Sequence, residues 1–146
     1  HRLMTTLNKA ARDCMVRYAV HACTDVTGFG LLGHAFEMAQ GSDTHLTLFP
    51  GEIDLIPEAL ELARDGILPA GMYRNRHYAE AAVDPGSTEL AVQDMLYDPQ
   101  TSGGLLIAAA PEDADALLRE LRGAVPSAQR IGVVEAYNGG PRISLR

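Results

Sequence analysis

An aspartate followed by a short segment with two glycines is the first group of residues that could do chemistry. Asp25 precedes Thr27, Gly28 and Gly30, and a helical pattern begins directly afterwards. A carboxylate is the hard oxygen ligand that Mg²⁺ prefers, usually beside substrate phosphates. Amide groups at a helix start can meet a phosphate oxygen, and glycines let a ligand approach the backbone closely. The segment is therefore a candidate site for a metal ion and a phosphate.

A purely structural role for the same segment stays open. Asp25 or Thr27 would also serve as a plain N-cap that accepts hydrogen bonds from the first amides of the helix, and on spacing alone such caps are the more common case. The residues around Gly28 and Gly30 do not match a known phosphate-loop pattern. His34 lies one helical turn beyond Gly30, so it could face the same site.

The second candidate is the polar loop at residues 98–104, which runs straight into an apolar segment. Thr101 and Ser102 supply hydroxyl groups, and Gly103 and Gly104 leave the backbone open to a ligand. Polar loops that feed a buried strand often carry functional residues. A turn that starts at the Asp98-Pro dipeptide explains the loop equally well.

The remaining titratable residues predict less. The sequence contains neither a nucleophile elbow nor an HExxH pattern. We interpret its histidines as core or surface residues: His1, His21, His34, His45 and His77. Cys14 and Cys23 lack the paired spacing of a structural zinc site, so we expect two small buried apolar residues in the reducing cytoplasm. The basic stretch 74–77 is interpreted as a solvated loop, with an anionic ligand or a partner domain as the alternative.

Composition sets the class of the protein. The chain has 146 residues, 47% of them hydrophobic and 21% charged, which is typical of one globular domain. Its net charge of −7 argues against nucleic-acid binding, which needs a positive surface. No apolar run approaches the roughly 20 residues that cross a bilayer, so we expect no membrane span. The chain begins at His1 instead of a methionine, and we expect it to be part of a longer protein.

The hydrophobic pattern predicts the elements that position these residues. Apolar spacings of three and four predict helices, and apolar runs and alternation predict strands. Helices are expected at 3–20, 31–40, 57–65, 90–96 and 111–122. Strands are expected at 45–49, 105–110, 130–136 and 142–145. Ser87 or Thr88 is the expected cap of the fourth helix, and residues 66–75 are expected to be irregular. Asn138-Gly139 predicts a hairpin between the last two strands. This order indicates an α+β fold with helices packed on a mixed β-sheet.

Two segments together resemble the signatures of the selenophosphate synthetase family, the selenide, water dikinases. Residues 24–34 read TDVTGFGLLGH, and residues 98–106 read DPQTSGGLL. They stand in the expected order and at the expected separation. The resemblance covers nearly the whole chain, but only as a C-terminal domain, and it implies the fold of the aminoimidazole-ribonucleotide-synthetase superfamily.

The resemblance also implies a reaction and its cofactors. ATP, selenide and water would give selenophosphate, AMP and phosphate, with Mg²⁺ held by aspartates. Most of those aspartates belong to an N-terminal ATP-binding domain, and Asp25 matches the one contributed from this half. Thr27 and Gly28 would then steady phosphate or the metal's ligand shell. A substrate-side or product-side role is expected for Thr101, Ser102 and Gly103.

The family's nucleophilic cysteine or selenocysteine and its catalytic lysine lie in an N-terminal segment that nothing here matches. We therefore assign no catalytic residue, and we give Cys14, Cys23 and Lys9 neither role. Residues 1–146 are expected to be a single C-terminal domain of a two-domain enzyme, inactive alone and part of a homodimer when complete.

Two other interpretations stay open. The chain would alternatively be the C-terminal domain of another ATP-dependent enzyme of the superfamily, such as a thiamine-phosphate kinase, a hydrogenase-maturation protein or a purine-synthesis enzyme. It would otherwise be a binding domain that kept the fold without the chemistry. Gln100 and Thr101 in the second motif favour the selenium enzyme, and an intact Asp25 argues against the binding domain.

Overall fold

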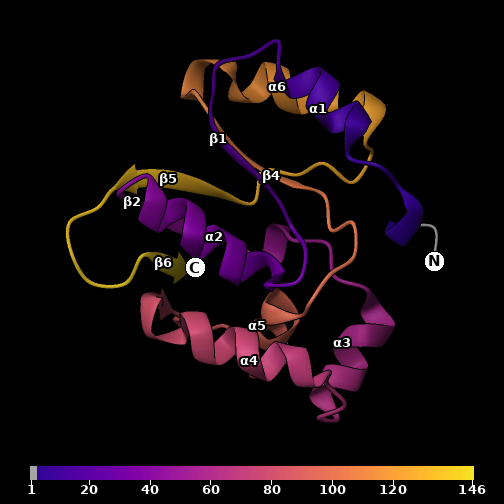
Figure 1. Ribbon diagram of the computed structural model, residues 1–146, viewed down its shortest axis with the longest axis vertical. Helices are drawn as coiled ribbons and strands as arrows, with labels where there is room; N and C mark the ends of the chain where they lie inside the picture. Colours follow the sequence, from indigo (N-terminus) through magenta and orange to yellow (C-terminus); the bar gives the residue numbers. More distant parts are fainter. Residues whose placement is uncertain (1–2) are drawn as a thin grey trace.

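The computed structural model describes residues 3–146, so His1 lies outside the described residues. Figure 1 shows the arrangement of the elements. The helices are α1 (Lys9–Met15), α2 (Gly30–Gly41), α3 (Pro57–Arg64), α4 (Ala70–Ala79), α5 (Leu90–Tyr97) and α6 (Pro111–Ala124). The strands are β1 (Val20–Asp25), β2 (Thr44–Leu48), β3 (Val83–Asp84), β4 (Leu105–Ala109), β5 (Gly132–Ala136) and β6 (Ile143–Leu145). Short 3₁₀ turns occupy η1 (Leu3–Thr5), η2 (Pro50–Glu52) and η3 (Glu80–Ala82).

The α+β class is confirmed, with the strands in two sheets. A four-stranded sheet has the order β3-β6-β2-β5. Strand β6 runs parallel to both of its neighbours, whereas β5 is antiparallel to β2, so this sheet is mixed. Strands β1 and β4 form a separate antiparallel pair.

Each sheet has its own hydrophobic core. The larger core lies between the four-stranded sheet and helices α2, α4 and α5, and its largest fully buried side chains are Leu32, Met72, Leu96, Ile143 and Leu145. The smaller core lies where α1 and α6 pack together against the β1–β4 pair, around Cys14, Leu117 and Leu121. In Figure 1 this pair of helices stands apart at the top of the molecule.

The β1–β4 ribbon joins the two cores. Leu105 and Ile107 of β4 pack against the smaller core, while Leu106 between them packs against the larger one, as strand alternation requires. The last register pair of the ribbon is Asp25 with Leu105. Both candidate loops therefore start at the same end of the same two strands.

The predicted hairpin between the last two strands is wrong. Strand β5 pairs with β2, and β6 inserts between β2 and β3. Ile143 and Leu145 are fully buried in that central position, with no measurable exposed area, whereas an edge hairpin would leave one side of the strand open. The turn around Asn138 carries the chain past β2 instead of back along β5.

The first predicted helix is too long. Within the predicted range only Lys9–Met15 is α-helical, after the short turn η1, and it ends early because the chain turns at residues 16–19 and Val20 enters β1 opposite Ala109. The Tyr18 hydroxyl donates to Glu120 of α6 at 2.7 Å, which fixes this turn on the neighbouring helix. Long-range strand pairing thus overrides a locally continuous apolar pattern.

The segment 66–75 is not irregular, because helix α4 covers most of it. Pro69 precedes its first residue, and Met72, Asn75 and Ala79 are its buried residues. The predicted cap of α5 is also wrong, since Glu89 stands at the N-cap and makes no side-chain cap hydrogen bond. Helices α2, α3, α5 and α6 and strands β2 and β4 lie within one or two residues of the expected ranges. Among the described residues no helix is long and apolar enough to cross a membrane.

Candidate functional site

The two candidate loops form one hydrogen-bonded unit. The Val26 amide donates to the Gly104 carbonyl at 2.9 Å, and the Gly103 amide donates to the Val26 carbonyl at 3.0 Å. The Gln100 amide donates to the Thr27 carbonyl at 2.9 Å. The loops thus extend the β1–β4 pairing beyond its last regular pair and are joined to each other through their backbones.

Two glycines allow this close contact. Gly30 has φ +70°, and a Cβ there would lie 2.7 Å from the carbonyl group of Tyr97. A Cβ on Gly103 would lie 2.7 Å from the Val26 carbonyl oxygen. Backbone atoms cannot yield as a flexible side chain can, so any side chain at either position would push the loops apart. Gly103 thus has a structural reason to be glycine, independent of a ligand.

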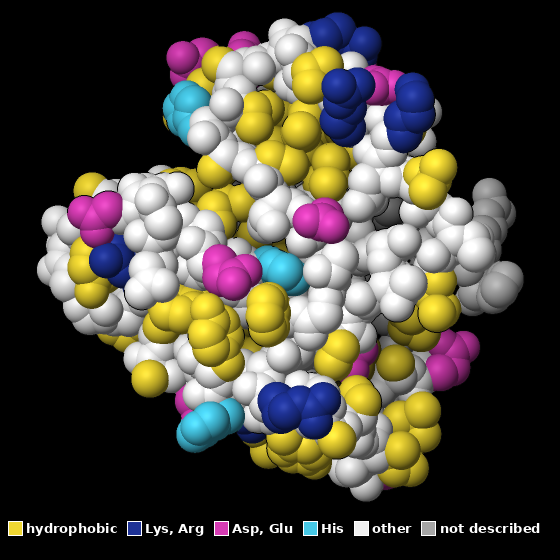
Figure 2. Space-filling view, viewed as in Figure 1, with side chains coloured by type: hydrophobic (Ala, Val, Ile, Leu, Met, Phe, Trp, Pro, Cys, Tyr) yellow, Lys and Arg dark blue, Asp and Glu magenta, His cyan; other side chains and the backbone are white. Residues whose placement is uncertain are grey.

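Asp25 ends β1 with an exposed side chain. Among the described residues its carboxylate has neither a hydrogen-bond partner nor an ion-pair partner. It opens onto a hollow of about 730 Å³, and the residues that line this hollow with it are Asn8, Lys9, Arg12, Met15, Cys23, Thr24 and Leu105. Figure 2 shows hydrophobic side chains gathered below the α1–α6 pair, with Lys or Arg side chains to one side and an acidic side chain at the lower margin.

The N-cap alternative is wrong for both residues. Helix α2 begins at Gly30, its N-cap is Phe29, and no side chain caps it. The Thr27 hydroxyl lies 3.1 Å from Nε2 of His34, and Nδ1 of the same ring lies 3.2 Å from Glu37. His34 is buried, so it faces the Asp25–Gly30 segment as its spacing indicated. Gly28 is exposed, and a Cβ there would meet no atom within 4 Å.

The second loop presents its polar residues beside this site and outside the hollow. Thr101 is exposed, and Ser102 is half-buried with φ 53°. Of the six candidate residues, only Asp25 lines the hollow. Asp98 is half-buried at the start of the loop, and burial raises the pKa of its carboxyl group.

Asn75 is the site residue that sequence reasoning missed. It is 6% exposed, and its Nδ2 donates to the Gly28 carbonyl and to the Tyr97 carbonyl, both at 2.9 Å. The prediction that residues 66–75 are irregular left Asn75 without an assigned role. The available signal was the spacing of Met72, Asn75 and Ala79, one polar residue on an otherwise apolar helical stripe behind a proline.

The cysteine prediction is half wrong. Cys14 is buried and Cys23 is exposed, and both thiols are free. Strand alternation turns Cys23 toward the same hollow as Asp25. Partial burial, together with the nearby Asp25 charge, raises the pKa of the Cys23 thiol, which leaves it protonated and weakly nucleophilic.

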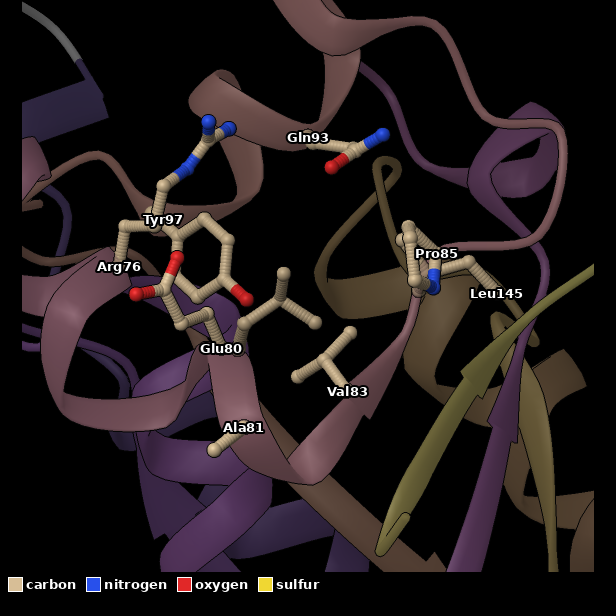
Figure 3. A pocket seen from close by; sticks show the side chains of 9 residues that line it. Arg76, Glu80, Ala81, Val83, Pro85, Gln93, Tyr97 and Leu145 are labelled. Atoms are coloured by element: carbon tan, nitrogen blue, oxygen red, sulfur yellow. The ribbon is translucent and has the colours of Figure 1, made fainter.

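The basic stretch 74–77 is helical, and one of its arginines is partly buried. Arg76 meets Asp94 of α5 at 2.5 Å, and its guanidinium lies 5.4 Å from the centre of the Tyr97 ring. Arg76 and Tyr97 line a second cavity of about 270 Å³ with Glu80, Gln93 and apolar side chains (Figure 3). Burial raises the pKa of Tyr97 to about 12, so its hydroxyl stays neutral.

The donor set fits a shared metal site. Within residues 3–146 no group of three or more His, Cys, Asp or Glu side chains could hold a metal ion. One unpartnered carboxylate beside an open hollow nevertheless matches the way Mg²⁺ is bound, by one or two carboxylates together with phosphates and water. Asp25 could therefore supply one ligand to an ion whose other ligands come from elsewhere.

A family model described as AIR synthase related protein, C-terminal domain, matches residues 1–142. The chain belongs to the AIR synthase related C-terminal domain family. This agrees with the superfamily that the two motifs implied, and it adds a second line of support for the α+β fold.

Proteins similar to this AIR synthase related domain include selenide, water dikinases. The chain is 46% identical to a selenide, water dikinase of Clostridioides difficile (strain 630) over 121 residues, which are 82% of this chain and 35% of that protein. It is 44% identical to a selenide, water dikinase of Desulfitobacterium hafniense (strain Y51) over 138 residues, which are 94% of this chain and 40% of that protein. The resemblance to selenophosphate synthetase is confirmed, and the matched regions span less than half the length of these relatives.

Proposed function

We propose that this chain is the C-terminal domain of a longer selenide, water dikinase. The relatives named above carry that name, and the chain matches about 35–40% of their length. The parent would have two domains, with the ATP-binding and catalytic groups in the N-terminal one. It would convert ATP, selenide and water to selenophosphate, AMP and phosphate, in the cytoplasm and as a homodimer.

The observation that carries the proposal is the state of Asp25. Lys9 and Arg12 line the same hollow, yet both bind Asp13 instead. This leaves the Asp25 carboxylate available to a ligand from outside the domain, at the mouth of a hollow wide enough to receive one.

The residues around Asp25 would hold a nucleotide-bound metal ion. Mg²⁺, when bound, offsets the negative charge of the nucleotide phosphates during transfer. Asp25 would supply one oxygen ligand across the domain boundary. The Thr27 hydroxyl would be held in place by His34, and the bare backbone at Gly28 would let a phosphate approach.

The second loop would bind a substrate or a product. Thr101 is exposed and Ser102 is half-buried beside the first loop, to which the Gly103 amide binds directly. Their hydroxyls are suited to donate hydrogen bonds to an anion such as a phosphate. No catalytic step is assigned to this chain, because a nucleophile and a catalytic lysine would come from the other domain. The isolated chain should therefore show no turnover.

The test is an assay of the full-length parent. We expect selenide-dependent conversion of ATP to AMP and phosphate. Asp25→Ala should reduce turnover at least roughly 100-fold, as the loss of a charge-stabilising group at phosphoryl transfer does. Glu37→Gln, which neutralises a carboxylate beside His34 and outside the hollow, should cost much less. Full turnover and an unchanged Mg²⁺ requirement in Asp25→Ala would refute the proposal.

A further inference from the structure

Helix α4 contacts both candidate loops although it belongs to neither. We propose that Asn75 is a positioning residue that sets the spacing of the two loops and thereby the direction of the Asp25 carboxylate. The metal-binding half of this inference rests on the proposed function. The loop-spacing half rests only on the contacts of Asn75.

One nitrogen atom makes the connection. Nδ2 of Asn75 has two hydrogens, and it donates one to the Gly28 carbonyl of the first loop and one to the carbonyl of Tyr97, the last residue of α5 directly before the second loop, each at 2.9 Å. Two carbonyl oxygens that share one amide nitrogen are held at a fixed separation. A side chain that only packs could not impose this distance.

The burial of the amide shows that these bonds are required. Asn75 is 6% exposed, and its neighbours on the buried face of α4 are Met72 and Ala79. A buried amide costs free energy unless its hydrogen bonds are made. An apolar residue would fill this face without that cost, so the amide is explained by the two carbonyls it serves.

Other contacts of the same helix act on the same loops. A Cβ on Gly71, one turn before Asn75, would lie 2.5 Å from Pro99. Helix α4 therefore packs directly against the second loop. Gly30 also packs closely against the Tyr97 carbonyl. The carbonyl of Tyr97 is thus a shared anchor for α4 and for the loop that follows Asp25.

The consequence for Asp25 follows from the shortness of the first loop. Only residues 26–29 separate the end of β1 from α2. With Gly28 fixed by Asn75 and Val26 fixed by the second loop, little freedom is left to the backbone next to Asp25. Releasing Gly28 would let this segment shift, and the carboxylate at its start would lose a defined direction.

The experiment compares Asn75→Asp with Asn138→Asp in the full-length protein. Both replace one amide by an acceptor-only carboxylate of nearly equal size. Asn138 is exposed in the turn after β5, where its Nδ2 donates to Ala136 at 3.3 Å, far in the fold from the loops. Asn75→Ala, which adds no charge, is the second variant and serves if Asn75→Asp does not fold.

The first readout is hydrogen exchange, which needs no catalysis. In the Asn75 variants we expect the amides of Gln100 and Gly103, which bind the first loop, to exchange at least five times faster. The amides of β2 and β6 should keep their protection. Equal exchange in the Asn75 and Asn138 variants would overturn the loop-spacing role.

The second readout is the Mg²⁺ concentration for half-maximal turnover. It should rise at least fivefold in the Asn75 variants and stay unchanged in Asn138→Asp. Faster exchange without this rise would overturn the positioning role. Asp25→Asn separates the two proposals: if it leaves the Mg²⁺ dependence of turnover unchanged, the proposed function fails, while the exchange result still decides whether Asn75 spaces the loops.

Discussion

Two aspartates of this chain occupy opposite environments. Asp25 is exposed at the end of β1 and has no side-chain partner among the described residues. Asp94 on α5 is 5% exposed and meets Arg76 at 2.5 Å. Burial raises the pKa of Asp94, and the Arg76 charge opposes that rise. The Asp25 carboxylate is available to a ligand, whereas the Asp94 carboxylate is buried beside Arg76.

The two carboxylates differ in what the fold asks of them, because only Asp94 has a charged partner among the described residues. Arg76 and Asp94 meet closely but not in hydrogen-bonding geometry, and Arg76 Nε is buried without a hydrogen bond among the described residues. Such a pair contributes little net stability, yet it cannot lose one member cheaply. The Asp25 side chain has no partner among the described residues, so its replacement should affect only the binding of a ligand or domain from outside.

The largest effect on stability is expected from breaking the buried pair. Asp94→Ala leaves Arg76 without its counter-charge and should lower the free energy of unfolding by about 3 kcal/mol. Asp25→Ala should change it by less than about 0.5 kcal/mol. Thermal unfolding of the full-length variants measures both. Similar losses in the two variants would erase the contrast between the two carboxylates.

A somewhat smaller loss of stability is expected from changing Gly30, where the first loop packs against the end of α5. Gly30→Ala combines an unfavourable positive φ with a Cβ 2.7 Å from the Tyr97 backbone, so it should cost about 2–3 kcal/mol. Gly28→Ala is the matched control, because its Cβ would meet nothing within 4 Å and stability should change by less than about 0.5 kcal/mol. If Gly28→Ala nevertheless lowers turnover, the lost approach of a phosphate explains it. A Gly30→Ala variant as stable as wild type would show that the loops are not tightly joined.

The smallest effect is a pH dependence of opposite sign in two variants. Because burial raises the folded pKa of Asp94 above 3.8, its ionisation costs stability as the pH rises from 3.8 through the folded pKa. Hydrogen bonds from Arg146 and the Gly86 amide lower the pKa of Asp84, so its stabilisation is present above 3.8 and is lost as the pH falls through the folded pKa.

Unfolding of wild type, Asp94→Asn and Asp84→Asn between pH 3 and pH 6 tests these signs. The advantage of wild type over Asp94→Asn should shrink as the pH rises above 3.8. Its advantage over Asp84→Asn should shrink as the pH falls below 3.8. Slopes of the same sign in both comparisons would contradict the environment we assign to Asp94.

The elements predicted correctly are those whose start and buried face are marked by residues close together in the sequence. Helix α6 begins at Pro111 with two acids in its first turn, and Leu117 and Leu121 stand one turn apart on its buried face. The segment from Asp25 to Gly30 was predicted to be a loop that enters a helix, and the structure agrees. These features depend on residues close in sequence, so the sequence alone predicts them.

Features that depend on distant partners were missed. The position of β6 follows from its burial between β2 and β3, which no turn signal at Asn138 could reveal. Helix α1 ends early because Val20 pairs with Ala109, a residue far along the chain. Asn75 went unnoticed because its role exists only where two loops meet.

The most direct test of the central claim is to locate the metal ion. Crystals of the full-length protein, grown with Mn²⁺ and a non-hydrolysable ATP analogue, would show the ion by its anomalous scattering. We expect an ion bound to an Asp25 carboxylate oxygen at roughly 2.2 Å, a distance close to that of Mg²⁺, with its remaining ligands from the nucleotide and the other domain. A nucleotide-bound ion with Asp25 outside its ligand shell would contradict the claim.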